Sequence, residues 1–421
     1  MKKNLLASIN WNIVDFATSL ILVLLINKIV VYYIGVKGYG IYSIAFLVSG
    51  TIALLDFGIS NCLTKYTAGE SDPKVVSEYY SATTLLSFSI FFLFSVVTFF
   101  MMGEIEKISS IYTSYSRTIA ILIVINILLT LLSQNINALC VARNDWKTVV
   151  TGNLVFKISN FIVVFIICFY KETDLVYFVF SFFFANLFRI LYLILSMMIK
   201  EELVRVKKPS VVYISKIFNF VRYSFINSIS GFAYNQLDKI LVVKYLGVIE
   251  LGYYSFVCQL INFTYSFSGA LAKVKLPIMS CLHNEKRVGE LILLANKLLL
   301  LTAGLFLLFS VTVYSLWLPM VSLYIDSTYA DESYSITIFA LIYLVVRSLE
   351  VNSFYLCSSI AKLKGFAIST TVIAFSFFLI SPYLIPLYGS SGILVFKSIL
   401  GLLLYGFVYF SIISRLKNKH E

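Results

Sequence analysis

Four stretches of this chain run for well over 20 residues without one charged side chain. They are Tyr79–Gly103, Thr118–Ala142, Leu298–Ile325 and Gly365–Phe396. A helix of about 20 mostly apolar residues spans the hydrocarbon core of a bilayer, so each stretch predicts at least one membrane helix. Composition agrees, because only 13% of the residues are charged, whereas a soluble domain carries about 25%. A soluble enzyme and a nucleic-acid-binding protein are therefore excluded.

Segments with one or two charges extend the prediction to about twelve membrane spans. The first, 9–33, follows Lys2 and Lys3 as a signal peptide would, but polar residues interrupt it and no cleavage site closes it. We therefore expect an all-α integral membrane protein whose first span is retained. The predicted spans are 9–33, 39–62, 79–102, 118–140, 148–170, 175–198, 217–244, 251–274, 291–314, 334–357, 366–387 and 391–413.

Basic side chains are unevenly distributed among the predicted loops. If the N-terminus lies inside and the spans alternate, the inside segments hold 20 lysines and arginines and the outside segments hold 5. Cytoplasmic loops of membrane proteins carry the excess of Lys and Arg. The bias predicts an even number of spans with both termini in the cytoplasm.

The sequence repeats itself at about half its length. Residues 30–43 and 242–255 match at eight of fourteen positions, and Gly35 aligns with Gly247. Each segment joins the first and second spans of a six-span half. Because six is even, both halves enter the membrane in the same direction, which predicts two parallel six-helix bundles. Such bundles with a cavity between them are typical of alternating-access transporters.

The repeat also predicts the domain organisation. A basic segment at 200–216 separates the two halves. We expect an N-terminal bundle at 1–199, a cytoplasmic linker loop at 200–216 and a C-terminal bundle at 217–421.

Motifs for catalysis and metal binding are missing from the sequence. The six cysteines are scattered with no C-x-x-C spacing, and the only histidines are His283 and His420. No G-x-S-x-G, H-E-x-x-H or P-loop motif occurs. We expect no cofactor, no metal site and no catalytic residue, so a transporter is favoured over an enzyme.

The segments Gly35–Ser43, Leu54–Ser60 and Lys65–Gly69 carry a family resemblance. With the duplicated plan, they resemble the Wzx-type polysaccharide (O-antigen and capsule) repeat-unit flippases, in the polysaccharide transport branch of the MATE-like MOP flippase superfamily. The resemblance implies a MATE/MOP-like fold in the bacterial cytoplasmic (inner) membrane. It implies translocation of undecaprenyl-pyrophosphate-linked oligosaccharide from the cytoplasmic to the outer leaflet, for O-antigen, lipopolysaccharide or another surface polysaccharide. Membrane lipids and polysaccharide polymerase machinery are the further partners to consider, and nucleic acid is not a partner.

Charged residues within the predicted spans indicate the sign of the substrate. A charge at mid-membrane costs about 3 kcal/mol on insertion scales, so these residues normally face the bundle interior. If Lys244 and Lys273, at the ends of their spans, are counted with the loops, bases outnumber acids by eight to four. This excess suits an anionic pyrophosphate, and arginine binds phosphate oxygens bidentately. The bases are Lys28, Lys157, Arg189, Arg222, Lys239, Lys297, Arg347 and Lys397, and the acids are Asp15, Asp56, Asp238 and Glu350.

Four of these bases are candidate substrate-binding residues in a cationic cavity. Arg189 and Arg347 lie near the middle of their spans, and Lys28 and Lys239 lie toward the outer ends of the equivalent spans one and seven. Each has a structural alternative. Arg347 can pair with Glu350 one helical turn away, and the lysines can extend to the membrane surface.

Asp15, Asp56 and Glu350 are candidate groups for coupling transport to an inward ion. Asp15 shares one face of the first span with Ser8 and Asn12. Such a polar stripe either lines a cavity or makes hydrogen bonds between helices. No nucleotide-binding motif is present, and a membrane potential that is negative inside favours the outward movement of an anion.

Two other functions compete with the flippase. A MATE-type drug or cation antiporter would need acids in its cavity, and the excess of bases counts against it. An integral-membrane polysaccharide polymerase would need a large outer loop with catalytic or acceptor-binding residues. The longest predicted outer loop, at 315–333, has about 20 residues and contains neither Arg nor His.

Overall fold

Long helices account for nearly all of the chain that the structure describes. This computed structural model describes residues 2–68, 70, 72–100, 115–200, 207–360 and 363–417, and no strand occurs among them. Eight helices within these ranges are long and apolar enough to cross a membrane. The predicted all-α membrane fold is therefore confirmed.

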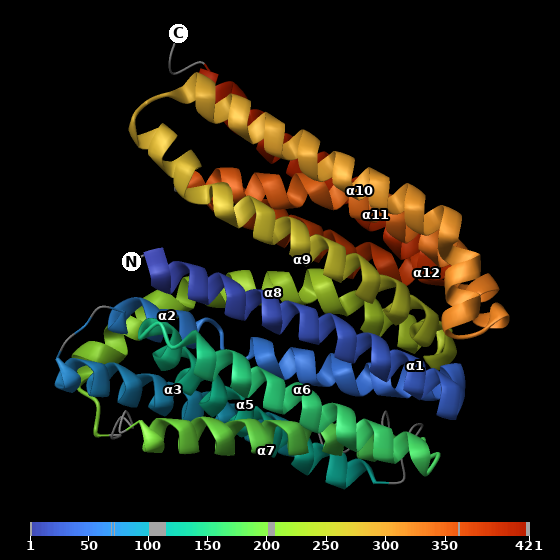
Figure 1. Cartoon of the computed structure of the whole chain (residues 1–421), viewed down its shortest axis with the longest axis horizontal. Coiled ribbons are helices and arrows are strands. Elements are labelled where there is room, and N and C mark those ends of the chain that lie inside the picture. Colours follow the sequence, from blue (N-terminus) through green and yellow to red (C-terminus); the bar gives the residue numbers. More distant parts are fainter. Residues whose placement is uncertain are drawn as a thin grey trace. The chain divides into compact units, whose positions relative to one another are not determined.

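The helices follow one another along the chain (Figure 1). The first half contains α1 (Lys2–Leu54), α2 (Ile59–Thr67), α3 (Pro73–Phe100), α5 (Ser116–Ala142), α6 (Trp146–Phe169) and α7 (Leu175–Ile199). The second half contains α8 (Val211–Leu246), α9 (Val248–Asn284), α10 (Val288–Tyr324), α11 (Ser327–Ser359) and α12 (Leu363–Lys417). At 53 and 55 residues, α1 and α12 are each long enough for two membrane spans.

Three glycines break the helical path with one shared backbone conformation. Gly35 in α1 has φ 71° and ψ −177°, and Gly389 in α12 has φ 63° and ψ −159°. Gly247, between α8 and α9, has φ 88° and ψ −178°. Only glycine adopts this region readily. Each break joins two predicted spans, and the matching geometry at Gly35 and Gly247 agrees with the sequence repeat.

The predicted span 39–62 is interrupted, which the sequence did not indicate. The backbone is left-handed at Phe57 (φ 50°) and Gly58 (φ 84°), and a new helix, α2, begins directly afterwards. Asp56 accepts hydrogen bonds from the backbone N–H of Ser60 at 3.1 and 3.2 Å and from its hydroxyl at 2.7 Å. The carboxylate thus satisfies donors that the helix start leaves open. The apolar run continues through this turn, so hydropathy alone could not reveal it.

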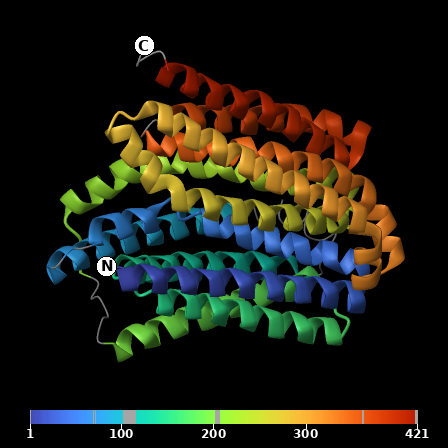
Figure 2. The ribbon, with the colours of Figure 1, turned by 45° about the horizontal axis from the view of Figure 1, so that its top comes forward.

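The chain divides into two compact units, Met1–Ile229 and Ser230–Glu421. In the first, α6 and α7 pack against each other and against α1; in the second, α11 packs against α9, α10 and α12. Figure 2 shows the helices within each unit running alongside one another. The predicted boundary at 200–216 stays a prediction, and residues 201–206 lie outside the described residues.

Helix α8 is shared by the two units, and its beginning is attached to the first. The backbone N–H of Lys207 donates to the Ser81 hydroxyl at 2.8 Å, and that of Ser210 donates to Glu78 Oε2 at 2.9 Å. The Tyr213 ring meets the Tyr79 ring edge-on at 4.8 Å. The end of α8, beyond Ser230, belongs to the second unit. One continuous helix therefore joins the two units.

Candidate functional site

A polar cluster connects α1, α6 and α7 in the first unit. Lys157 Nζ on α6 lies 2.5 Å from Asp15 Oδ1 on α1. Asn153, one turn before Lys157, donates to Asp15 Oδ2 at 3.3 Å and accepts from Arg189 Nη2 on α7 at 3.0 Å. We call Asp15, Asn153, Lys157 and Arg189 the first-unit cluster. It contains two bases and one acid and so has a net charge of +1.

Arg189 has no carboxylate in direct contact within the described ranges. Its hydrogen-bond partner Asn153 is neutral, and among the described residues no salt bridge involves it. The guanidinium carbon lies 6.0 Å from the centre of the Phe156 ring. Its Nε atom is buried and has no hydrogen-bond partner in the described part of the chain. The guanidinium therefore retains donor capacity for an anion.

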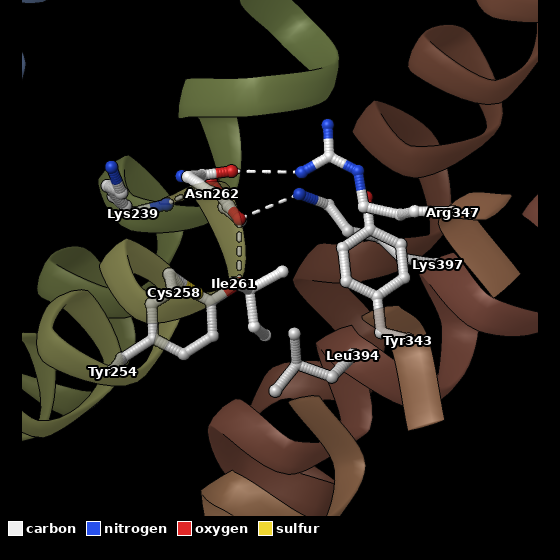
Figure 3. A pocket seen from close by; sticks show the side chains of 10 residues that line it. Lys239, Tyr254, Cys258, Ile261, Asn262, Tyr343, Arg347, Leu394 and Lys397 are labelled. Carbon is white, nitrogen blue, oxygen red and sulfur yellow. Dashed lines mark hydrogen bonds and ion pairs between the residues drawn. The ribbon is translucent and has the colours of Figure 1, made fainter. Parts of the chain in front are cut away.

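The second unit contains a small, strongly charged cavity (Figure 3). Its volume is about 20 Å³, which is room for about one water molecule. In Figure 3, Arg347 and Lys397 reach into the cavity, and dashed lines mark the contacts of Arg347 with Asn262 and of Lys397 with Asp238. The cavity is lined by Asp238, Lys239, Tyr254, Cys258, Ile261, Asn262, Tyr343, Arg347, Leu394 and Lys397.

Asp238, on α8, is the carboxylate of this cavity. Its Oδ2 lies 2.7 Å from Lys397 Nζ on α12 and accepts the Tyr254 hydroxyl of α9 at 2.6 Å. Its Oδ1 accepts the backbone N–H of Lys239 at 2.8 Å. The side chains of Asp238 and Lys397 are only 5% and 3% exposed. The Lys239 ammonium makes a longer hydrogen bond, 3.3 Å, to Gln236.

Arg347, on α11, forms the other charged pair at the cavity. Its Nε lies 3.2 Å from Glu350 Oε2, and its Nη1 donates to Asn262 Oδ1 at 2.9 Å. Tyr265 donates its hydroxyl to Glu350 Oε1 at 2.9 Å, and its ring centre lies 3.5 Å from the Arg347 guanidinium carbon. A cation against an aromatic face is stabilised by the ring's charge distribution. The pairing of Arg347 with Glu350, which the sequence offered as an alternative to a binding role, is present.

The structure distributes the predicted residues over several places. Arg347 and Lys239 share the cavity, and Arg189 and Asp15 share the first-unit cluster. Lys28 has an exposed side chain on α1. The side chains of Ser8, Asn12 and Arg222, which the sequence also suggested, lie outside the described residues.

Two lysines of these clusters were not among the predicted binding residues. Lys157 and Lys397 were recognised as membrane bases, but their partners Asp15 and Asp238 lie 142 and 159 residues away in sequence. Lys397 is buried and does not reach the surface of the protein. The sequence did contain a signal for the Lys397 pair, since Asp238 is an acid within a predicted span and such an acid needs a base as its partner. Among the described residues, no group of three His, Cys, Asp or Glu side chains is placed to hold a metal ion.

Comparison with known proteins supplies the family and the fold. The family model described as polysaccharide biosynthesis protein matches residues 5–283. No curated protein sequence matches. An inward-facing multidrug resistance MATE transporter of the MOP superfamily aligns with a TM-score of 0.77 at 12% identity, covering 94% of both chains.

Two further structures agree with that fold. The lipid II flippase MurJ, in an inward closed conformation, aligns with a TM-score of 0.77 at 15% identity, covering 96% of this chain and 87% of that one. A MOP-superfamily transporter from Pyrococcus furiosus Vc1 (DSM3638), described by the reverse polarity of its binding pocket, aligns with a TM-score of 0.66 at 12% identity. The alignment covers 97% of this chain and 95% of that one. The predicted MATE/MOP-like fold is confirmed.

Proposed function

This chain belongs to the polysaccharide biosynthesis protein family, and on that premise we propose that it flips undecaprenyl-pyrophosphate-linked oligosaccharide repeat units. Transport runs from the cytoplasmic to the outer leaflet of the inner membrane by alternating access, and it serves O-antigen or another surface polysaccharide. The observation that carries the proposal is the excess of bases over acids in the first-unit cluster and in the cavity of the second unit. A transporter in this family with a basic interior suits an anionic precursor.

The chemistry of such a substrate fits the cluster residues. A lipid-linked pyrophosphate carries roughly two negative charges, and desolvating them in a membrane is costly unless bases pair with them. Arg189 has a donor to spare, and Arg347 and Lys239 lie at one cavity. We assign these three bases to the pyrophosphate along the transport path. Lys28, exposed on α1, is the fourth proposed contact.

The membrane potential contributes to outward transport of this anion. It is worth about 2.3 kcal/mol per charge per 100 mV, and the inside is negative. Asp15 and Glu350 are each held by a base, so protonating either acid would release a base. We propose these two acids for ion coupling ahead of Asp56, which is bonded to Ser60 at the start of α2. We propose that both termini and the 200–216 linker lie in the cytoplasm, and the distribution of basic residues among the loops supports this orientation.

Cells that lack this chain test the proposed function directly. We expect lipid-linked repeat units to accumulate on the cytoplasmic leaflet, where inverted membrane vesicles expose them to a glycosidase that cannot cross the membrane. Accumulation of single units in the outer leaflet would instead indicate a polymerase. The control is the same strain complemented with the intact chain, which should restore surface polysaccharide.

A MATE-type drug or cation antiporter is the second candidate. It is supported by the fold, since the MATE transporter aligns with the same TM-score as MurJ, 0.77. The basic clusters oppose it, because a cation would be repelled from both. Proteoliposomes that contain the purified chain and a cationic dye distinguish the two functions. We expect no dye movement above that of empty liposomes under an imposed proton or sodium gradient.

A further inference from the structure

The charged cavity of the second unit holds one carboxylate among three bases. Lys239, Arg347 and Lys397 line it together with Asp238. We propose that Asp238 is an internal anion, which occupies the position that a diphosphate group takes when it binds. This inference rests on the proposed function, because it assigns a role to a residue beside the proposed pyrophosphate contacts.

The donors around Asp238 are the kinds that bind phosphate oxygens. They are the ammonium of Lys397 at 2.7 Å, the hydroxyl of Tyr254 at 2.6 Å and the backbone N–H of Lys239 at 2.8 Å. Lysine, tyrosine and backbone N–H groups are recurrent phosphate ligands in proteins. A diphosphate oxygen placed where Asp238 Oδ2 lies would therefore receive the hydrogen bonds of Lys397 and Tyr254. The Lys239 N–H lies on α8 and stays with Asp238.

The size of the cavity requires that Asp238 leave before a diphosphate enters. With Asp238 in place, about 20 Å³ is empty, which holds about one water molecule. The donors Tyr254 and Lys397 each lie about two turns after a glycine break, at Gly247 and Gly389 respectively. Ser390 and Glu250 join these two breaks by a 2.5 Å hydrogen bond. The two donor helices are thus fastened to each other.

Asp238 itself lies on α8, before the break at Gly247. Helix α8 begins in the first unit and ends in the second. Asp238, Tyr254 and Lys397 all belong to the second unit but lie on three different helices. The inference therefore places the exchange in a shift of α8 relative to α9 and α12. The carboxylate withdraws as the diphosphate enters, and it returns as the substrate leaves.

A purely structural role explains the buried pair less well. Breaking a buried ion pair is costly, but replacing both partners by apolar residues is often neutral or stabilising. Stability alone therefore gives no reason to keep Asp238 and Lys397 at 5% and 3% exposure. An exchangeable anion explains why the pair is kept, because it neutralises the bases between transport cycles and keeps unrelated anions out of the cavity.

Binding of inorganic pyrophosphate to the purified full-length chain in detergent tests the inference. We expect Asp238→Asn to bind pyrophosphate at least about 10-fold more tightly than the wild type, or about 1.4 kcal/mol. The matched control is Glu250→Gln, which removes one negative charge from the same unit outside the cavity and keeps an acceptor for Ser390. Its affinity should equal that of the wild type. Unchanged or weaker binding by Asp238→Asn overturns the inference.

Thermal unfolding decides the case in which Asp238→Asn is too unstable for titration. If the carboxylate is an internal anion, added pyrophosphate replaces it and raises the melting temperature of Asp238→Asn more than that of the wild type. Membranes extracted with pyrophosphate present should then yield folded protein. A variant that pyrophosphate does not rescue shows that Asp238 is structural, and the inference is wrong.

A parallel titration with undecaprenyl pyrophosphate in mixed micelles identifies the source of the diphosphate. If Asp238→Asn binds both ligands more tightly than the wild type by the same factor, the cavity recognises the diphosphate alone. If the affinity rises only for the lipid, the lipid tail is needed for binding. A rise confined to the lipid supports the inference only where pyrophosphate still stabilises Asp238→Asn in the thermal test.

Failure of the inference is separable from failure of the proposed function. If pyrophosphate stabilises Asp238→Asn but the chain does not transport lipid-linked oligosaccharide, the proposed function fails and this inference stands. If the chain transports the oligosaccharide but Asp238→Asn leaves pyrophosphate binding unchanged, this inference fails and the proposed function stands.

Discussion

The polar clusters of the two units both contain more bases than acids, but their charged pairs are enclosed to different degrees. In the first unit, the side chains of Lys157 and Asp15 are 21% and 27% exposed. In the second, those of Arg347 and Glu350 are 5% and 9% exposed. Water can screen a stranded charge in the first cluster but not in the second. Equal substitutions should therefore affect stability strongly in the second unit and weakly in the first.

Arg347→Ala should give the largest effect. It leaves Glu350 as a buried acid without its base, and such a loss costs about 3–5 kcal/mol. The unfolding free energy in detergent, measured against the wild type, should fall by that amount, and the amount of protein in the membrane should fall with it.

A second substitution separates the stranded charge from lost packing. Adding Glu350→Gln to Arg347→Ala removes the unpaired acid while Tyr265 keeps a hydrogen-bond acceptor. We expect much of the lost stability to return. No recovery would mean that the contact of Arg347 with the Tyr265 ring, and not the ion pair, stabilises α11.

Gly35→Ala and Gly389→Ala compare the two units at their helix breaks. Both glycines have positive φ with extended ψ, and an added Cβ would meet nothing within 4 Å at either. The cost is therefore backbone strain alone, about 1–3 kcal/mol, and it should be equal in the two units. Melting temperatures of the two variants measure it. Unequal losses would show that the breaks are not equivalent.

Arg189→Ala should reduce stability by only about 1 kcal/mol. It removes one hydrogen bond to neutral Asn153 and a distant contact with the Phe156 ring. The Asp15–Lys157 pair stays intact, so no acid is stranded. Unfolding measured beside Arg347→Ala gives the comparison. A loss as large as that of Arg347→Ala would contradict the difference in enclosure.

The smallest effect concerns Asp145, at the start of α6 outside the membrane-spanning segments. Partial burial raises the pKa of this carboxyl, but hydrogen bonds from Lys200 and Thr148 outweigh it and hold the pKa below its ordinary value. The ionised Asp145 carboxylate therefore stabilises the fold fully above the pKa that it has in the unfolded chain, about 3.9. This stabilisation is lost as the pH falls through the lower pKa that the group has in the folded protein. Melting temperatures of the wild type should fall slightly more than those of Asp145→Asn on acidification toward pH 3.

Much of the helical path could be predicted because it depends on local composition. Apolar length gave the spans, and the spacing of Arg347 and Glu350 gave their contact, since residues three apart meet on a helix. The break at 55–58 was not predictable, because its cause is backbone geometry within an apolar run. The partners of Lys157 and Lys397 were not predictable either. Periodicity defines the face of a helix but not which other helix packs against it.

The central claim is that the buried bases bind the anionic group of a lipid-linked oligosaccharide during transport. Its most direct test is the movement of a fluorescent undecaprenyl-pyrophosphate oligosaccharide across proteoliposomes that contain Arg189→Ala, Arg347→Ala and Glu350→Gln together. Glu350→Gln alone is the control, and Arg189→Lys with Arg347→Lys keeps the charge without the bidentate geometry. The account predicts loss of transport in the folded triple variant, partial transport in the lysine variant and more transport in the control than in the triple variant. Wild-type transport by the folded triple variant would contradict it.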